Sequence, residues 1–165
     1  MHLAKSFAVS LLGLSGTLVE VEADISSNLP GFVLVGLPDA SLSEASARVR
    51  AAIVNSKLSL PARKITVNLS PAAVPKFGSS FDLAIAISVL AAQQPFSQSR
   101  LESCVHIGEL GLDGSVRAVN GVLPAVVAAR DLGFRLAVVP MANLLEARLV
   151  AGIEVIGVTS LRQAV

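Results

Sequence analysis

Apolar and charged side chains alternate within residues 17–25, where Val19, Val21, Ala23 and Ile25 are separated by carboxylates. Successive side chains of a β-strand point to opposite faces, so the alternation predicts a strand with one buried face. A short apolar segment over residues 6–12 precedes it, and residues 14–16 (Leu-Ser-Gly) predict a hairpin turn between the two. Further strands are predicted over residues 32–37, 64–69, 105–112, 135–139 and 153–158.

Apolar residues recur at helical spacing over residues 39–56, which predicts a helix with one buried stripe. The stripe consists of Leu42, Ala45, Val49, Ala52 and Ile53. Asp39 or Ser41 is expected to cap the start of this helix through its side-chain oxygen.

Three more helices are predicted in the second half of the chain. Residues 81–93 are apolar on nearly every side, which predicts a helix buried all round. Asn120 is expected to cap a third helix, which runs to about Leu132 and ends at Gly133. A short helix is predicted over residues 141–149.

Strands come first in this order of elements, and helices then alternate with strands. The order predicts an α+β or α/β fold in which helices pack on a mixed sheet. The length of 165 residues fits a single domain over residues 1–165. With 53% hydrophobic and 15% charged residues, the chain is too apolar and too weakly charged to be disordered.

The apolar segments are too short to cross a membrane, because the longest uncharged one covers residues 83–92. No signal-peptide pattern is present, so the cytoplasm is the expected location and no membrane partner is expected. Cys104 is the only cysteine and cannot form an internal disulfide. Histidines and cysteine lack metal-ligand spacing, so no metal or cofactor is expected in this domain.

Basic residues are concentrated in the middle of the chain although the net charge is only +1. Residues 45–81 contain six basic residues and no acidic one. The candidates for a nucleic-acid-binding face are Arg48, Arg50, Arg63, Lys64 and Lys76. The alternative is that these residues are spread over three elements and point in different directions.

Motifs for nucleotide binding and for common hydrolases are absent. The chain has neither the phosphate loop G-x-x-x-x-G-K-[ST] nor the serine elbow G-x-S-x-G. Ser79 and Ser80 lie where a loop enters a buried helix, where backbone amides could stabilise negative charge. A serine nucleophile needs a base, and Lys76, four residues before Ser80, is the nearest candidate in sequence. The alternative is that the serines only cap the helix.

Several motifs resemble the opening of the Mg-chelatase-like ComM/YifB proteins. They are Val-Gly-Leu-Pro-Asp-Ala at residues 35–40, Arg-Lys-Ile-Thr-Val-Asn-Leu at 63–69, Gly-Ser-Ser-Phe-Asp-Leu at 78–83 and Gly-Glu-Leu-Gly-Leu-Asp-Gly at 108–114. The resemblance implies the N-terminal, Lon-protease-like domain of an AAA+ ATPase, with a ribosomal protein S5 domain 2-like fold. The ATPase module, with its ATP and Mg, is expected downstream of this chain. Full-length relatives are hexameric, and the ComM branch implies DNA processing during competence and transformation.

Lon-type peptidases use a Ser–Lys dyad, and the resemblance places Ser80 on the nucleophile. It places Ala125 where the base lysine belongs, and no lysine follows Lys76 in the chain. Without that amine Ser80 lacks a general base. We therefore expect no catalytic residue and a non-catalytic domain that supports ring assembly, DNA contact or both. The alternatives are a Ser-dependent peptidase using Ser80 and Lys76, and a purely structural oligomerisation module.

Overall fold

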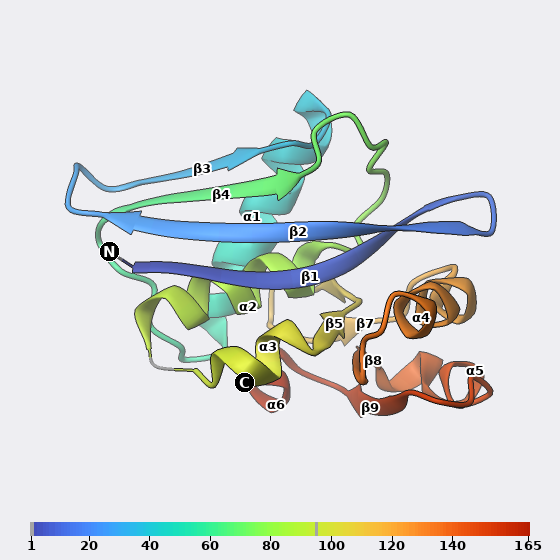
Figure 1. The fold of residues 1–165 in the computed structure, drawn as a ribbon. Helices are drawn as coiled ribbons and strands as arrows, with labels where there is room; N and C mark the ends of the chain where they lie inside the picture. The colour runs from blue at the N-terminus through green and yellow to red at the C-terminus, as the bar shows by residue number, and fades with distance from the viewer. Residues whose placement is uncertain (1, 95) are drawn as a thin grey trace.

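The computed structural model describes residues 2–94 and 96–165, and the alternating segment forms its longest strand, β2 (Ser15–Ser26). Every second residue of β2 from Val19 to Ile25 is buried, and the charged residues between them are half-buried. β2 pairs antiparallel with β1 (His2–Leu12) along its whole length, and Figure 1 shows this hairpin crossing the molecule. The predicted strand and its orientation are confirmed.

The described residues form a mixed seven-stranded sheet in the order β3-β4-β2-β1-β5-β8-β9. Pairing is antiparallel from β1 to β2 and from β2 to β4, and parallel elsewhere. The other strands are β3 (Gly31–Val35), β4 (Lys64–Ser70), β5 (Cys104–His106), β8 (Leu136–Pro140) and β9 (Glu154–Val158), while β6 (Glu109–Leu110) and β7 (Val116–Arg117) form a separate two-stranded sheet. The predicted mixed sheet with packed helices in one domain is thus what the structure shows.

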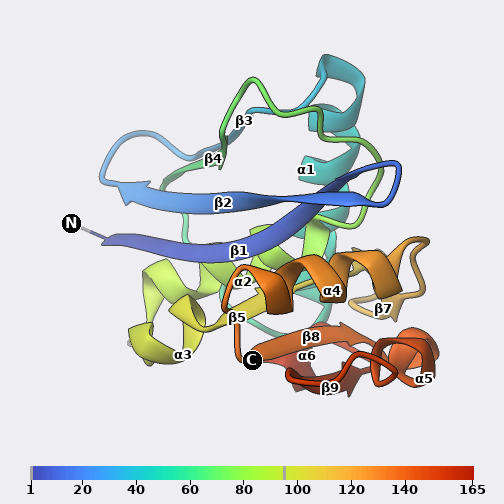
Figure 2. The same cartoon turned by 45° about the vertical axis from the view of Figure 1, so that its right-hand side comes forward.

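Two apolar clusters form the core, one on each side of the sheet. The larger lies between β1 to β4 and the helices α1 (Asp39–Asn55) and α2 (Asp82–Gln93). The smaller lies between β5, β8 and β9 and the helices α4 (Val122–Asp131) and α5 (Leu144–Ala147). Figure 2 shows α4 below the β1–β2 hairpin, on the side away from α1. The short elements are α3 (Gln98–Glu102), η1 (Met141–Asn143) and α6 (Leu161–Ala164).

Helices α1 and α2 match their predicted spans and burial. Ala45, Val49, Ala52 and Ile53 of the predicted stripe are buried, whereas the side chains of Leu42 and Asp39 lie outside what the structure describes. Ten of the residues of α2 from Asp82 to Ala92 are buried, as the apolar pattern indicates.

The predicted helix caps are wrong. Pro38 occupies the N-cap position of α1, without a side-chain hydrogen bond, rather than Asp39 or Ser41. Gly121, with φ of +79°, takes the N-cap position of α4 that was expected for Asn120. Glycine adopts this left-handed conformation without steric cost, so the chain turns sharply into α4 there.

The predicted single strand over residues 105–112 is also wrong, because the chain leaves the main sheet after β5. The N–H of Gly108 donates to the carbonyl of Ser80 rather than to a strand. A Cβ at Gly108 would lie only 2.9 Å from Val116 Cγ1, so a larger residue here would require the side chain of Val116 in β7 to shift. The segment therefore becomes β5 and β6 in two different sheets, and the short α3 and β7 escaped prediction from the sequence.

Candidate functional site

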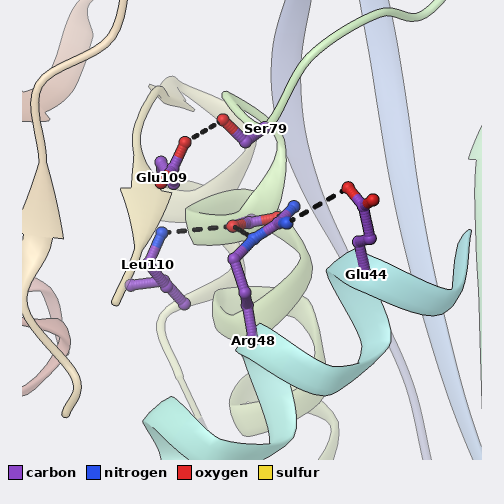
Figure 3. Close-up of polar contacts among 6 residues, drawn as sticks. Glu44, Arg48, Ser79, Glu109 and Leu110 are labelled. Carbon is purple, nitrogen blue, oxygen red and sulfur yellow. Dashed lines mark hydrogen bonds and ion pairs between the residues drawn. The ribbon is translucent and has the colours of Figure 1, made fainter. Parts of the chain in front are cut away.

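Helix α2 begins with a buried carboxylate that is paired with an arginine of α1. The side chain of Asp82 is 1% exposed and that of Arg48 is 22% exposed. Nε of Arg48 donates to Oδ2 of Asp82 at 2.6 Å, and Nη2 donates to Oδ1 at 3.1 Å. The backbone N–H of Leu110 in β6 donates to the same Oδ2 at 3.2 Å. Figure 3 shows these groups converging between α1, α2 and β6.

Burial and pairing act in opposite directions on this carboxylate. Desolvation raises the pKa of Asp82, and the hydrogen bonds from Arg48 and from the N–H of Leu110 oppose that rise. The hydrogen bond to Asp82 raises the pKa of Arg48, so the guanidinium stays charged. The pair therefore links α1 to α2, because the guanidinium and the carboxylate neutralise each other.

Two further contacts flank this ion pair, as Figure 3 shows. Nη1 of Arg48 lies 3.8 Å from the carboxylate of Glu44, which is 72% exposed and one turn earlier on α1. The hydroxyl of Ser79, in the loop before α2, donates to the carboxylate of Glu109 in β6. The hydrogen bond between Ser79 and Glu109 joins the loop that carries Ser80 to the small sheet.

Ser80 and Ala125 line the same small cavity. It has a volume of about 120 Å³, and its wall also includes Asn120 and Gly121 at the start of α4. Ser80 is half-buried and Ala125 is 3% exposed. No lysine, arginine or histidine is among the residues that line this cavity in the described part of the chain. The serine therefore shares this cavity with an alanine, and none of the described residues that line it is a base for the hydroxyl.

Lys76, the other candidate base, is held within its own loop. Lys76 is 2% exposed, and its Nζ donates to the carbonyls of Pro71 at 2.7 Å and Val74 at 2.9 Å. Desolvation lowers the pKa of this amine. Because the amine of Lys76 donates to these carbonyls, it stabilises the loop and is not exposed to bind a phosphate.

Of the five basic candidates, the structure brings three together at one edge of the sheet. Arg50 and Arg63 are exposed and line a hollow of about 390 Å³ beside Pro30 and Phe32. Lys64 lines the adjoining hollow of about 430 Å³. Among the described residues, those that line these two hollows include no aspartate or glutamate. We call Arg50, Arg63 and Lys64 the basic edge; Arg48 and Lys76 are not part of it.

Comparison with known proteins gives the chain a family. The sequence model of the family described as "Subunit ChlI of Mg-chelatase" matches residues 21–143. The chain belongs to this family.

Relatives of this ChlI-family chain extend the match. An uncharacterized protein of Mycobacterium tuberculosis (strain H37Rv) is 54% identical over 163 residues, covering 99% of the chain and 32% of the relative. Competence protein ComM of Haemophilus influenzae is 45% identical over 130 residues, covering 79% of the chain and 26% of the relative. The archaeal Lon protease of Methanocaldococcus jannaschii is 31% identical over 131 residues, covering 76% of the chain and 20% of the relative. The chain thus spans about a third of the first of these proteins and less of the others.

Neither a metal-binding cluster of side chains nor a phosphate loop is found in the described part of this ChlI-family chain. Within residues 2–94 and 96–165, no group of three or more His, Cys, Asp or Glu side chains could hold a metal ion. The sequence has no phosphate loop that could cradle the phosphates of a nucleotide. In that same part of the chain, no helix is long and apolar enough to span a membrane.

Sequence reasoning missed the ion pair and the hydrogen bond that organise the start of α2. Asp82 gave a usable signal, because it is the only charged residue in an otherwise apolar helix and needs a buried partner. Glu109 gave none, since its partner Ser79 lies 30 residues away in the chain.

Proposed function

We propose that this chain is the non-catalytic N-terminal domain of a Mg-chelatase-like AAA+ ATPase of the ComM/YifB type. On this proposal the domain has a Lon-like, S5 domain 2-like fold and works in the cytoplasm, where it contacts DNA and supports assembly of the ATPase ring. ATP and Mg belong to the AAA+ module and not to this domain. The ChlI family match and the similarity to ComM and to archaeal Lon protease support the proposal.

The basic edge is the observation that carries the DNA contact. Its three cations come from α1, from the loop before β4 and from the first residue of β4, and they line hollows whose described lining residues include no carboxylate. Such a surface can neutralise phosphates of the DNA backbone without reading bases. By contrast, the half-buried face of β2 bears Glu20, Glu22 and Asp24, and Lys5 pairs with the first two.

The cavity of Ser80 supports the non-catalytic part of the proposal. A Ser–Lys peptidase needs the amine within hydrogen-bonding reach of the hydroxyl. Ala125 lines the cavity instead, and Lys76 donates to Pro71 and Val74. A peptidase that uses Ser80 and Lys76 therefore finds no support in this arrangement.

The test is binding of the 165-residue chain to labelled single- and double-stranded DNA across a salt series. We expect weak binding, with the logarithm of the binding constant falling against log salt with a slope of about −3 for three phosphates on duplex DNA. Changing Arg50, Arg63 and Lys64 together to Gln should abolish it. The matched control changes the exposed Arg117, Arg135 and Arg148 to Gln, removing the same charge elsewhere.

Two results would contradict DNA contact by this domain. One is no binding to either form of DNA at low salt. The other is equal loss of binding in the two triple variants, since net charge alone would then explain it. In either case ring assembly remains as the function, and the native mass of a longer protein with and without this domain would measure it.

A further inference from the structure

Strand β3 forms one edge of the seven-stranded sheet, and in the described part of the chain no strand pairs with its outer side. Figure 1 shows it as the uppermost strand of the sheet. The N–H of Gly31 donates to the carbonyl of Arg63 at 3.4 Å. Backbone groups of successive residues point to alternate sides of a strand, so Phe32 and Leu34 direct their N–H and C=O groups away from β4. These groups are available to an added strand.

The sequence of β3 lacks the features that prevent strand addition. Natural edge strands are usually protected by a proline, a bulge or charged side chains. β3 has five uncharged residues, Gly-Phe-Val-Leu-Val, which pair in unbroken register with β4. Its two valines, Val33 and Val35, are 41% and 47% exposed. A regular apolar edge of this kind favours pairing with another extended chain.

The two hollows of the basic edge lie on opposite faces of the sheet at the start of β3. Phe32 packs against the larger core cluster, on the α1 side, and lines the hollow of about 390 Å³ with Arg50 and Arg63. Gly31 and its β4 partner Lys64 lie one position earlier, on the opposite face, and line the hollow of about 430 Å³. Because consecutive side chains of a strand point to opposite faces, two neighbouring residues of an added strand would meet one hollow each.

The charge at these hollows selects the side chains that fit them. Among the described residues, the lining of the two hollows includes the three cations of the basic edge and no carboxylate. An added strand with two consecutive carboxylates places one beside Arg50 and Arg63 and the other beside Lys64. Backbone hydrogen bonds to β3 then supply affinity, and the two carboxylates supply specificity.

We propose that β3 binds an extended acidic segment of a partner protein, which adds to the sheet as an antiparallel strand. Antiparallel pairing is the more stable kind per residue, and it brings the C-terminal end of the segment to the basic edge. The proposal goes beyond DNA contact and does not rest on it, because DNA contact makes no use of the backbone groups of Phe32 and Leu34.

The probe is the capped peptide acetyl-VTVTEE-amide, added to the ¹⁵N-labelled 165-residue chain. Saturation should slow amide hydrogen exchange of Phe32 and Leu34 about tenfold, because their N–H groups then donate to the peptide. Val33 and Val35, which face β4, provide the internal control and should change little. Unchanged exchange at Phe32 and Leu34 in the saturated complex would overturn the proposal.

Two further peptides test the role and the position of the carboxylates. Calorimetry should show that acetyl-VTVTQQ-amide binds about fivefold more weakly, because it lacks two exposed ion pairs. The reversed peptide acetyl-EETVTV-amide has the same composition and charge, but in antiparallel pairing its carboxylates lie away from the basic edge, so it should bind as weakly. Equal affinity of the three peptides, or tighter binding of the reversed one, would overturn the proposal.

The two triple variants of the DNA test separate this inference from the proposed function. The variant of the basic edge should bind the acidic and the neutral peptide equally, while the control variant should keep the fivefold difference. Peptide binding without DNA binding would contradict DNA contact alone, and DNA binding without peptide binding would overturn the peptide site alone. Amides of Phe32 and Leu34 that are protected without peptide and lose protection on dilution would show a second copy on β3, which also overturns the proposal.

Discussion

Arg48 and Asp82 are 34 residues apart in sequence and meet in a two-point ion pair, with Nε 2.6 Å from Oδ2 and Nη2 3.1 Å from Oδ1. The pair joins α1 to the first turn of α2, which places Ser79 and Ser80 directly before a helix whose position is fixed. A guanidinium used in this way inside the protein is not available to a phosphate. The basic stretch of the sequence therefore contains residues that are paired inside the protein, such as Arg48, and residues that are exposed at its surface, such as Arg50.

Reversing the charge of Arg48 should destabilise the protein strongly. Arg48→Glu leaves the carboxylate of Asp82, which is 1% exposed, without its partner and next to a like charge. Breaking a buried pair in this way costs about 3–5 kcal/mol. Urea unfolding followed by circular dichroism measures the loss.

Arg50→Glu, two residues further along the same helix, is the matched control for that prediction. Arg50 is exposed, and an exposed substitution changes the free energy of unfolding by only about 0.5 kcal/mol. If Arg48→Glu and Arg50→Glu unfold at the same urea concentration, the ion pair does not stabilise the fold.

Lys76→Met should also destabilise the protein, although a lysine on a loop is normally replaceable. The thioether keeps most of the buried stem but removes the donors to the carbonyls of Pro71 and Val74. Losing hydrogen bonds that a charged amine donates costs about 1.5–3 kcal/mol. The exposed Lys57 gives the control Lys57→Met, which should unfold as the wild type does; equal effects in the two variants would show that Nζ of Lys76 makes no net contribution.

Peptide hydrolysis should be absent, and Ser80→Ala should change nothing. Ser80 shares its cavity with Ala125, and no base lines that cavity in the described part of the chain. The measurement is release of fluorescent fragments from labelled casein, together with labelling by a fluorophosphonate. Labelling of the wild type that disappears in Ser80→Ala would instead establish an activated serine and favour the peptidase alternative.

The sequence predicts the elements well where one physical pattern acts locally. The period of two in β2 and the apolar surface of α2 both follow from burial, and both are confirmed. The prediction fails where a contact between residues distant in sequence determines the local structure. Gly108 leaves the sheet because Ser80 accepts its N–H, and nothing near residue 108 signals this hydrogen bond.

The same limit separates the predicted from the observed site residues. Composition identifies a basic stretch. Only the packing of α1 on α2 shows that Arg48 pairs with Asp82 while Arg50 stays exposed. Position in sequence also suggests Lys76 as a base for Ser80, because four residues are close along a chain. In the structure, Nζ instead donates hydrogen bonds to the carbonyls of Pro71 and Val74, because the backbone of the loop places these carbonyls around it.

His106 should make the protein less stable in mild acid. Burial lowers the pKa of its imidazole from 6.5 to about 4 in the folded state, so the ring is neutral at pH 7. Below pH 6.5 the unfolded chain takes up a proton that the folded state still excludes, and the free energy of unfolding falls until the pH reaches about 4. The difference of pKa corresponds to about 3 kcal/mol across this window.

Urea unfolding at pH 7, 6, 5 and 4 for the wild type and for His106→Phe isolates this contribution, because the carboxylates and His2 are common to both proteins. The variant should lose less stability than the wild type between pH 6.5 and 4, whereas parallel curves would mean that His106 is protonated in the folded state or accessible to water.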